Sequence, residues 1–123
     1  MAAAALLMAS GIGIGALGSH ALRGVLSSRQ LVSLGTAVEY QQVNALGLLL
    51  VGVLMRYVPR SGLHLVAWLL MAGILCFSGG IYVMLAGAPA LLGLVTPVGG
   101  VMLIVAWLVL AWLLVEESVI KRR

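Results

Sequence analysis

Apolar residues dominate four stretches of the chain, and short segments rich in glycine, proline, serine or arginine separate them. A helix needs about 20 mostly apolar residues to cross the hydrocarbon core of a membrane. Each stretch reaches that length, so the pattern predicts spanning helices over about residues 2–22, 37–57, 63–86 and 96–115. We expect an all-α, polytopic membrane protein, a single membrane domain over residues 1–123 that forms a four-helix transmembrane bundle.

The segment before the second span predicts a short helix of its own. Ser27 or Ser28 can cap a helix start, because a serine oxygen accepts a hydrogen bond from the free N–H groups of the first turn. Leu31 and Leu34 then lie on one face of that helix. We therefore expect a short interfacial helix over about residues 27–36, between the first and second spans.

The fourth span can begin in two ways. Thr96 followed by Pro97 is typical of a helix start, with the threonine as N-cap and the proline at a position where its missing N–H costs nothing. Residues 91–95 would then form an interfacial or partly re-entrant link. The alternative is a longer, proline-kinked helix that begins near Leu91.

The composition agrees with a membrane protein, since 63% of the residues are hydrophobic and only 8% are charged. A soluble domain carries about 25% charged residues. The net charge of +4 lies in short loops and a terminal tail, so we expect no nucleic-acid partner and take the lipid bilayer as the main partner. The single cysteine, Cys76, excludes a disulfide within the chain.

The basic residues predict the orientation of the spans, because cytoplasmic loops carry an excess of Lys and Arg. One side holds only Arg23 and Arg29, whereas the side of both termini holds Arg56, Arg60, Lys121, Arg122 and Arg123. This bias favours cytoplasmic N- and C-termini in a bacterial inner (plasma) membrane. The first span lacks the basic residues that open a secretory signal, so we expect it to remain uncleaved.

Polar residues near membrane depth gather toward one leaflet, the outer one in this orientation. They end the first span, begin the second and the fourth, and occupy the last third of the third. The candidate contact residues for a ligand, a proton or a partner are His20, Arg23, Glu39, Tyr40, Asn44, Ser78, Tyr82 and Thr96. Gln41 and Gln42 lie in the same stretch as Glu39. Tyr40 and Asn44 are one turn apart, so they can bond neighbouring helices.

Glu39 is the one acid between the two ends of the chain. An unpaired carboxylate inside a membrane is costly, so Glu39 must be paired, hydrated or protonated if it lies in the bundle. One hypothesis is a proton or solute site that Glu39 forms with His20, with Arg23 as a further partner. The alternative is an interfacial carboxylate that stabilises the positive end of the second helix.

Other reactive groups are sparse. His64 stands at the start of the third span beside arginine and serine, where an interfacial histidine is expected. Two histidines and one cysteine show no metal-ligand spacing, and no nucleophile–base pair is visible. We therefore expect no metal, no cofactor and no enzymatic activity.

The glycines of the first span invite two interpretations. Gly13, Gly15 and Gly18 have the G-x-G-x-x-G spacing of a dinucleotide-binding turn, but that turn must follow a strand inside a soluble βαβ unit. Gly11, Gly15 and Gly18 instead share one helix face, the small-xxx-small pattern that lets membrane helices approach closely. Helix packing is expected at these three positions and at complementary glycines of the third and fourth spans, Gly73, Gly79, Gly80, Gly99 and Gly100.

Four motifs occur in an order that resembles a known family: GALGSHAL at 15–22, TAVEYQQVNAL at 36–46, FSGGIY at 77–82 and TPVGG at 96–100. The chain resembles domain-of-unknown-function family 423, which includes the animal transmembrane protein 256 group. The resemblance implies a small four-helix membrane protein and supplies no catalytic residue. Members usually carry a histidine where Asn44 stands, so only His20 remains of that pair.

Two functions stay open at this point. The first is a non-enzymatic membrane protein whose outer-leaflet polar cluster binds a partner helix, a lipid or a small ligand, for example as an accessory subunit of a membrane complex or as a homo-oligomer. The second is a minimal proton or solute transporter or channel that uses Glu39 and His20.

Overall fold

A computed structural model describes residues 1–58 and 61–120, without the side chains of 90 and 117–120. All regular structure in this part of the chain is helical, and four helical segments are long and apolar enough to cross a membrane, as predicted. The elements are α1 (Ala2–His20), η1 (Leu22–Gly24), α2 (Ser28–Tyr57), α3 (Ser61–Ile74), η2 (Leu75–Gly79), α4 (Gly80–Leu85), η3 (Ala90–Leu94) and α5 (Val95–Ile120).

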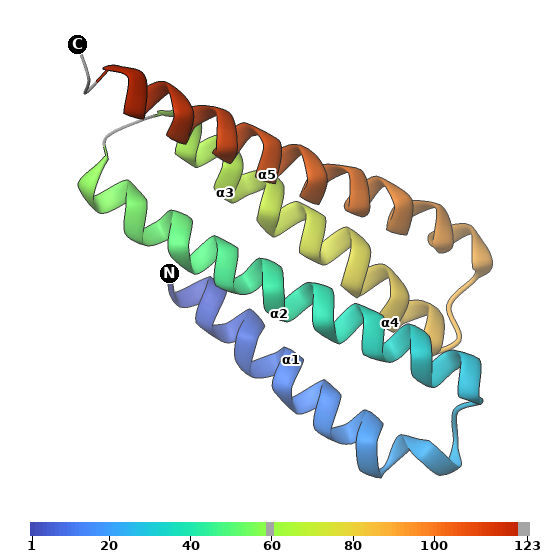
Figure 1. Cartoon of the computed structure of the whole chain (residues 1–123). Helices are drawn as coiled ribbons and strands as arrows, with labels where there is room; N and C mark the ends of the chain where they lie inside the picture. Colours follow the sequence, from blue (N-terminus) through green and yellow to red (C-terminus); the bar gives the residue numbers. More distant parts are fainter. Residues whose placement is uncertain (59–60, 121–123) are drawn as a thin grey trace.

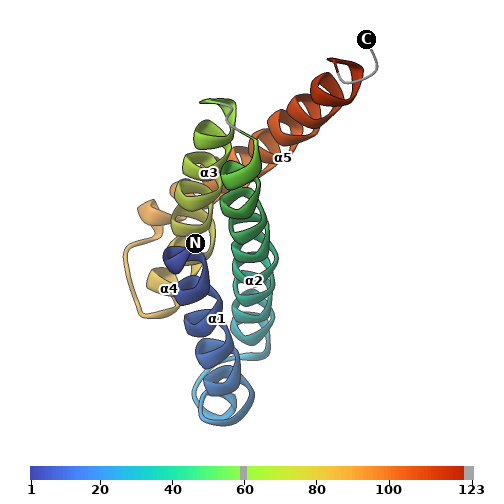
Figure 2. The ribbon, with the colours of Figure 1, turned by 90° about the vertical axis from the view of Figure 1, so that its left-hand side faces the viewer.

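The long helices lie side by side and alternate in direction (Figure 1). α2 packs against α1 and against the third span, which α3, η2 and α4 form together, and α5 packs against α3. The N-terminus, the end of α2, the start of α3 and the end of α5 lie toward one end of the bundle. The view in Figure 2 shows α5 diverging from the other helices as it approaches its C-terminal end.

The predicted serine cap is present at Ser27, but the helix that it starts is longer than predicted. The Ser27 hydroxyl oxygen accepts from the Gln30 backbone N–H at 3.3 Å, and the Gln30 side chain accepts from the Ser27 N–H at 2.9 Å. This reciprocal pair is a capping box. Residues 28–36 then continue without a break into the second span, so the structure has no separate interfacial helix over 27–36.

The third span contains a π-helical turn, η2, between α3 and α4. The backbone of α5 comes very close to this turn, since a Cβ atom built on Gly99 would meet the backbone N of Phe77 and lie 2.8 Å from the Cβ atom of Cys76. α4 ends at Leu85, and Gly87, two residues later, has a φ of 94°. A glycine adopts this left-handed conformation without steric cost, and its N–H bonds the Met84 carbonyl.

The start of the fourth span differs from the expected Thr96 cap. The 3₁₀ turn η3 leads directly into α5, whose first residue is Val95, so Thr96 already lies inside the helix. Pro97 remains in the first turn, where no intrahelical partner needs its N–H. The α-helix thus begins one residue before the predicted start of the span at Thr96, and the 3₁₀ turn extends the helical segment back to Leu91, where the alternative placed its start.

The glycine face of α1 packs against α2 rather than against the third span. Cβ atoms built on Gly11, Gly15 and Gly18 would lie 3.2, 3.2 and 2.6 Å from side-chain atoms of α2. The third span uses its own glycines toward α5, where a Cβ on Gly73 would lie 2.6 Å from Leu103, and one on Gly80 would lie 2.8 Å from Thr96. Helix packing at Gly79 is not seen, because nothing lies within 4 Å of a Cβ built there, and Gly100 makes only ordinary contacts.

The bundle has an apolar half and a polar half. Buried aliphatic residues of α2, α3 and α5 fill the half nearest the end of α2; they include Val51, Leu63, Val66, Leu70, Ala106 and Leu110. The buried polar side chains lie farther toward the α1–α2 connection; they are Gln41, Asn44 and Ser78. A functional site is therefore expected in the polar half of the bundle.

Candidate functional site

Gln41 is the centre of a polar network that joins three helices. Its side-chain amide donates to the Leu7 carbonyl at 2.6 Å and to the Ser10 hydroxyl at 2.8 Å, both on α1. Its side-chain oxygen accepts from the Tyr82 hydroxyl of α4 at 2.7 Å. With 3% of its surface exposed, Gln41 satisfies its polar groups within the protein, as a buried amide must.

Two further hydrogen bonds between helices, and one within α2, extend this network to the rest of the bundle. The Ser78 hydroxyl in η2 donates to the Ala37 carbonyl of α2 at 2.7 Å. The Trp107 indole N–H of α5 donates to the Asn44 side-chain oxygen at 2.9 Å, and the Asn44 amide donates to the Tyr40 carbonyl at 2.8 Å. α2 is therefore hydrogen-bonded through side chains to α1, to the third span and to α5.

α1 and α2 are antiparallel, and the contacts between them show which residues of α2 lie beside α1. A Cβ built on Gly52 would lie 2.8 Å from the Met1 side chain, and one built on Gly18 would lie 2.6 Å from Leu34. The part of α2 that runs beside α1 therefore covers residues 34–52. This part is about 27 Å long, close to the hydrocarbon thickness of a membrane.

The polar network reaches the middle of this shared part. Its midpoint falls between Gln41 and Asn44, and Glu39 lies only about 6 Å from it along the axis. The prediction of a cluster confined to the outer leaflet assumed a helix start at Ala37. Because α2 begins at Ser28, two and a half turns earlier, the same residues lie farther from the start of the helix than predicted.

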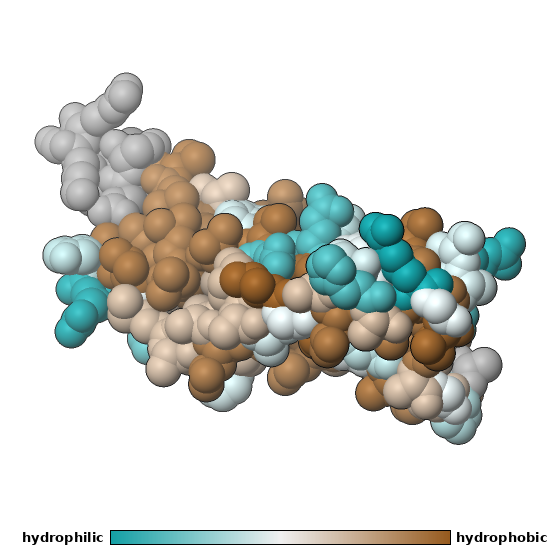
Figure 3. Space-filling model, turned by 90° about the horizontal axis from the view of Figure 1, so that it is seen from below, coloured by the Kyte–Doolittle hydropathy of each residue, from teal (hydrophilic) through white to brown (hydrophobic). Residues whose placement is uncertain are grey.

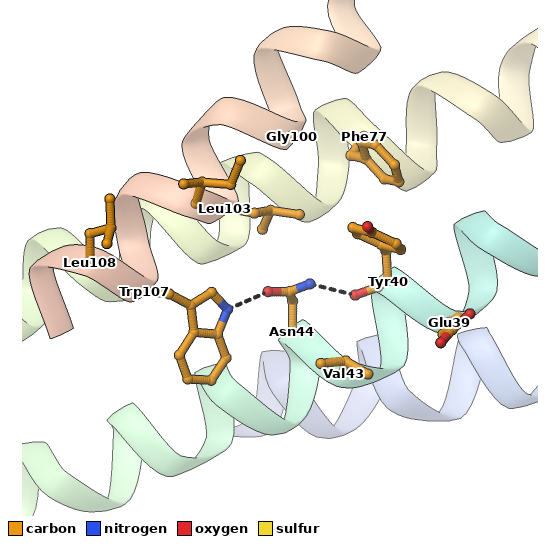
Figure 4. A pocket seen from close by; sticks show the side chains of 10 residues that line it. Glu39, Tyr40, Val43, Asn44, Phe77, Gly100, Leu103, Trp107 and Leu108 are labelled. Atoms are coloured by element: carbon orange, nitrogen blue, oxygen red, sulfur yellow. Dashed lines mark hydrogen bonds between the residues drawn. The ribbon is translucent and has the colours of Figure 1, made fainter. Parts of the chain in front are cut away.

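A groove of about 620 Å³ opens beside this network, between α2 and α5. We call it the α2–α5 groove. Figure 4 shows Trp107 reaching from α5 to Asn44, and Tyr40 facing Phe77 of η2. The Tyr40 and Phe77 rings stack with centroids 4.6 Å apart. The lining residues are Glu39, Tyr40, Val43, Asn44, Phe77, Gly100, Leu103, Ile104, Trp107 and Leu108.

Glu39 supplies the carboxylate of this groove, and its side chain is exposed. Among the described residues, none forms an ion pair or hydrogen bond with it. The predicted partnership with His20 is not present: Gly15 meets Val38 and the two helices are antiparallel, so His20 lies about 9 Å from Glu39 along the bundle axis. Arg23 lines a different pocket, which Gly18, Ser19 and Gly35 also line.

Hydrophilic side chains are visible on the face that α1 and α2 share. Figure 3 shows them over the middle of this face and over the part toward the α1–α2 connection, while the other half is mostly hydrophobic. A bilayer-spanning surface is usually apolar, and polar groups at this depth mark functional sites in membrane proteins.

Thr96, the last of the predicted site residues, lies outside the groove lining. Its hydroxyl is buried against Gly80 and has no hydrogen-bond partner. No group of three His, Cys, Asp or Glu side chains comes together in the described part of the chain. Arg60 and the C-terminal basic residues, which entered the prediction of orientation, lie outside the described residues.

Sequence reasoning did not assign roles to Gln41, Ser10, Phe77 or Trp107 in the site. A signal for Gln41 was available, because Ala37, Gln41 and the later buried positions of α2 recur every three to four residues. Trp107 and Phe77 come from helices far apart in sequence, and their approach to α2 depends on how the helices pack.

Comparisons with known proteins agree with this architecture. The family model described as "Protein of unknown function (DUF423)" matches residues 14–100. The chain is 39% identical over 99 residues to a UPF0382 membrane protein of Staphylococcus epidermidis, with 80% of each chain covered. It is 37% identical over 100 residues to the UPF0382 membrane protein YwdK of Bacillus subtilis, with 80% of this chain and 81% of YwdK covered.

No solved structure matches the chain. The matched region nevertheless contains α2, the whole third span and the start of α5, which together form most of the polar network and the groove. Because the family model covers more than half of the chain and the relatives align over four fifths of it, this chain belongs to the DUF423 family of UPF0382 membrane proteins.

Proposed function

We propose that this protein is a non-enzymatic membrane protein that binds a small amphipathic ligand in the α2–α5 groove. The observation that carries the proposal is the exposed Glu39 carboxylate, which has no ion-pair partner among the described residues and lies in an otherwise largely apolar groove near the middle of the bundle. Ligand sites are typically apolar cavities of about 300–1,000 Å³ with a few well-placed polar groups. The groove has this size and this chemistry.

The groove's polar groups favour binding over catalysis. Both polar groups of the Asn44 side chain and the Trp107 N–H are engaged in hydrogen bonds within the protein. The described lining residues include no serine, cysteine, histidine or lysine that could act as a nucleophile or base beside Glu39. A single carboxylate can hold a ligand by its charge without any chemical step.

A photo-crosslinker placed in the groove should capture one discrete species. Val43 lines the groove and Leu46 lies on the same helix outside it, and their side chains are 54% and 56% exposed. With benzoylphenylalanine at position 43 in native membranes, we expect one dominant adduct by mass spectrometry, whereas position 46 should give the mixture of bulk lipids. Identical adducts at both positions would refute a groove ligand.

The identity of the adduct distinguishes the forms that a binding protein can take. A lipid or a small molecule at position 43 supports the proposal directly. A polypeptide adduct, together with one-to-one co-purification in mild detergent, would instead favour a partner helix and an accessory role in a complex.

A minimal proton or solute transporter is the second candidate, and the depth of the unpaired Glu39 favours it. Ionisable residues inside spanning segments often belong to proton or substrate pathways. The purified protein, reconstituted in liposomes with a pH-sensitive dye, tests it. Proton flux that is lost in Glu39→Gln would support the transporter, and flux at the level of empty liposomes would leave the binding role.

We further propose that the protein lies in the bacterial plasma membrane with cytoplasmic termini. Arg56 lies in the last turn of α2, and the sequence adds Arg60 shortly after α2 and Lys121, Arg122 and Arg123 after α5. In a Cys76→Ala background, a membrane-impermeant maleimide should label Ser28→Cys in intact spheroplasts and label Ser61→Cys only after lysis. The reverse pattern would invert the topology.

A further inference from the structure

The α2–α5 groove combines a negative charge with aromatic faces. Glu39 supplies the carboxylate, and Tyr40, Phe77 and Trp107 supply three rings from α2, η2 and α5. Tyr40 is 45% exposed and Trp107 is 39% exposed, so part of each ring is free to contact a ligand. Carboxylates attract cations directly, and aromatic faces attract them through the ring quadrupole.

Few hydrogen-bonding groups of the groove remain free for a ligand. The Asn44 amide donates to the Tyr40 carbonyl, and its oxygen accepts from the Trp107 N–H. A primary ammonium carries three N–H donors that need acceptors in a dry site. A quaternary ammonium has no N–H donor, so a carboxylate and aromatic faces satisfy it fully.

The rest of the groove is an apolar strip. Val43 on α2 and Leu103, Ile104 and Leu108 on α5 extend the lining away from Glu39 and past Trp107. Such a strip suits an alkyl chain attached to the charged head. The ion pair with Glu39 would also cancel the net charge, which makes a cation tolerable at this depth.

We propose that the α2–α5 groove binds an amphipathic quaternary ammonium compound, with its cationic head against Glu39 and its alkyl chain along Val43, Leu103 and Trp107. This inference rests on the proposed binding function and names the chemical class of its ligand. The charge complementarity of the groove and the Tyr40 and Phe77 rings near Glu39 carry it.

Quenching of Trp107 fluorescence by a brominated ligand tests the proposal. A protein whose one tryptophan is Trp107 is made by Trp68→Phe and Trp112→Phe, since both of these side chains are highly exposed. In phosphatidylethanolamine–phosphatidylglycerol nanodiscs, (6-bromohexyl)trimethylammonium should quench Trp107 saturably. The neutral 6-bromohexanol should quench it only in proportion to its concentration.

Matched variants distinguish binding of the probe in the groove from its partitioning into the membrane. A protein that keeps only Trp112, outside the groove lining, should show unsaturated quenching by both probes. Glu39→Gln should raise the half-saturating concentration of the ammonium probe by about tenfold or more, the factor that corresponds to about 1.4 kcal/mol of lost affinity. Glu39→Asp should keep saturable binding, and Glu116→Gln, outside the groove, should leave it unchanged.

Two results would overturn the proposal. Equal saturable quenching by the alcohol would mean that the groove binds amphiphiles without selecting a cation, which leaves the binding function intact. Identical, unsaturated quenching in the Trp107 and Trp112 proteins would mean that the ammonium does not bind the groove, and the crosslinking at position 43 then decides the binding function independently.

Discussion

Replacing Gln41 by leucine should lower the free energy of unfolding by about 2–3 kcal/mol, a large loss for one polar side chain in a membrane bundle. The variant loses three hydrogen bonds to Leu7, Ser10 and Tyr82. Interhelical hydrogen bonds in membrane proteins are worth about 0.6 kcal/mol on average and at most about 1.7 kcal/mol. Three of them on one side chain account for the expected loss, which reversible unfolding in mixed detergent micelles can measure.

A second polar residue of α2 provides the matched control for Gln41. The Thr36 hydroxyl donates to the Val32 carbonyl of its own helix, so Thr36→Ala breaks no bond between helices and should cost little. The double variant Gln41→Leu, Tyr82→Phe should be less destabilised than the sum of the two single variants, because they share one hydrogen bond. Equal losses in Gln41→Leu and Thr36→Ala would contradict the assignment of Gln41 as the link between helices.

The sequence predicts the four candidate spans because bilayer thickness sets the length of an apolar helix, whatever its neighbours are. It predicts the start of α2 less well for a local reason. Ser33 and Thr36 resemble loop residues in an apolar chain, but their hydroxyls donate to the Arg29 and Val32 carbonyls one turn earlier. These bonds satisfy both side chains inside a helix, so the helix continues from Ser28.

The longer α2 also explains why the candidate site was only partly predicted. Tyr40, Asn44 and Glu39 were named from their types and spacing, and all three line the groove. Their depth and their partners depend on helix boundaries and packing. Gly15 of α1 packs at the level of Val38, so Glu39 is out of register with His20, and it lines the groove beside α5 instead.

The π-helical turn η2 contributes both to helix packing and to the groove. It supplies Ser78 to the polar network and Phe77 to the groove lining. The sequence FSGG alone does not predict such a turn, because a π turn depends on what presses against it. Here α5 presses against it through Gly99, where a Cβ atom would meet backbone atoms of Phe77 and Cys76.

Gly99→Ala should therefore destabilise the protein by about 2 kcal/mol or more, although alanine favours helices over glycine by about 1 kcal/mol. The added Cβ would lie 2.9 Å from the Cys76 carbonyl carbon and closer still to the Phe77 nitrogen. Backbone atoms cannot rotate away as a side chain can, so α5 and η2 must separate. Thermal and denaturant unfolding of the detergent-solubilised protein measure this loss.

The neighbouring glycine gives the sharpest control for this prediction. A Cβ on Gly100 would lie 3.6 Å from the Phe77 ring, an ordinary contact, so Gly100→Ala should be neutral or stabilising by up to about 1 kcal/mol. Separation of α5 from η2 in Gly99→Ala should also displace Phe77 and reduce the discrete crosslink at position 43. If Gly99→Ala were as stable as Gly100→Ala, the close approach of α5 to η2 would be wrong, and with it the position of Phe77 in the groove.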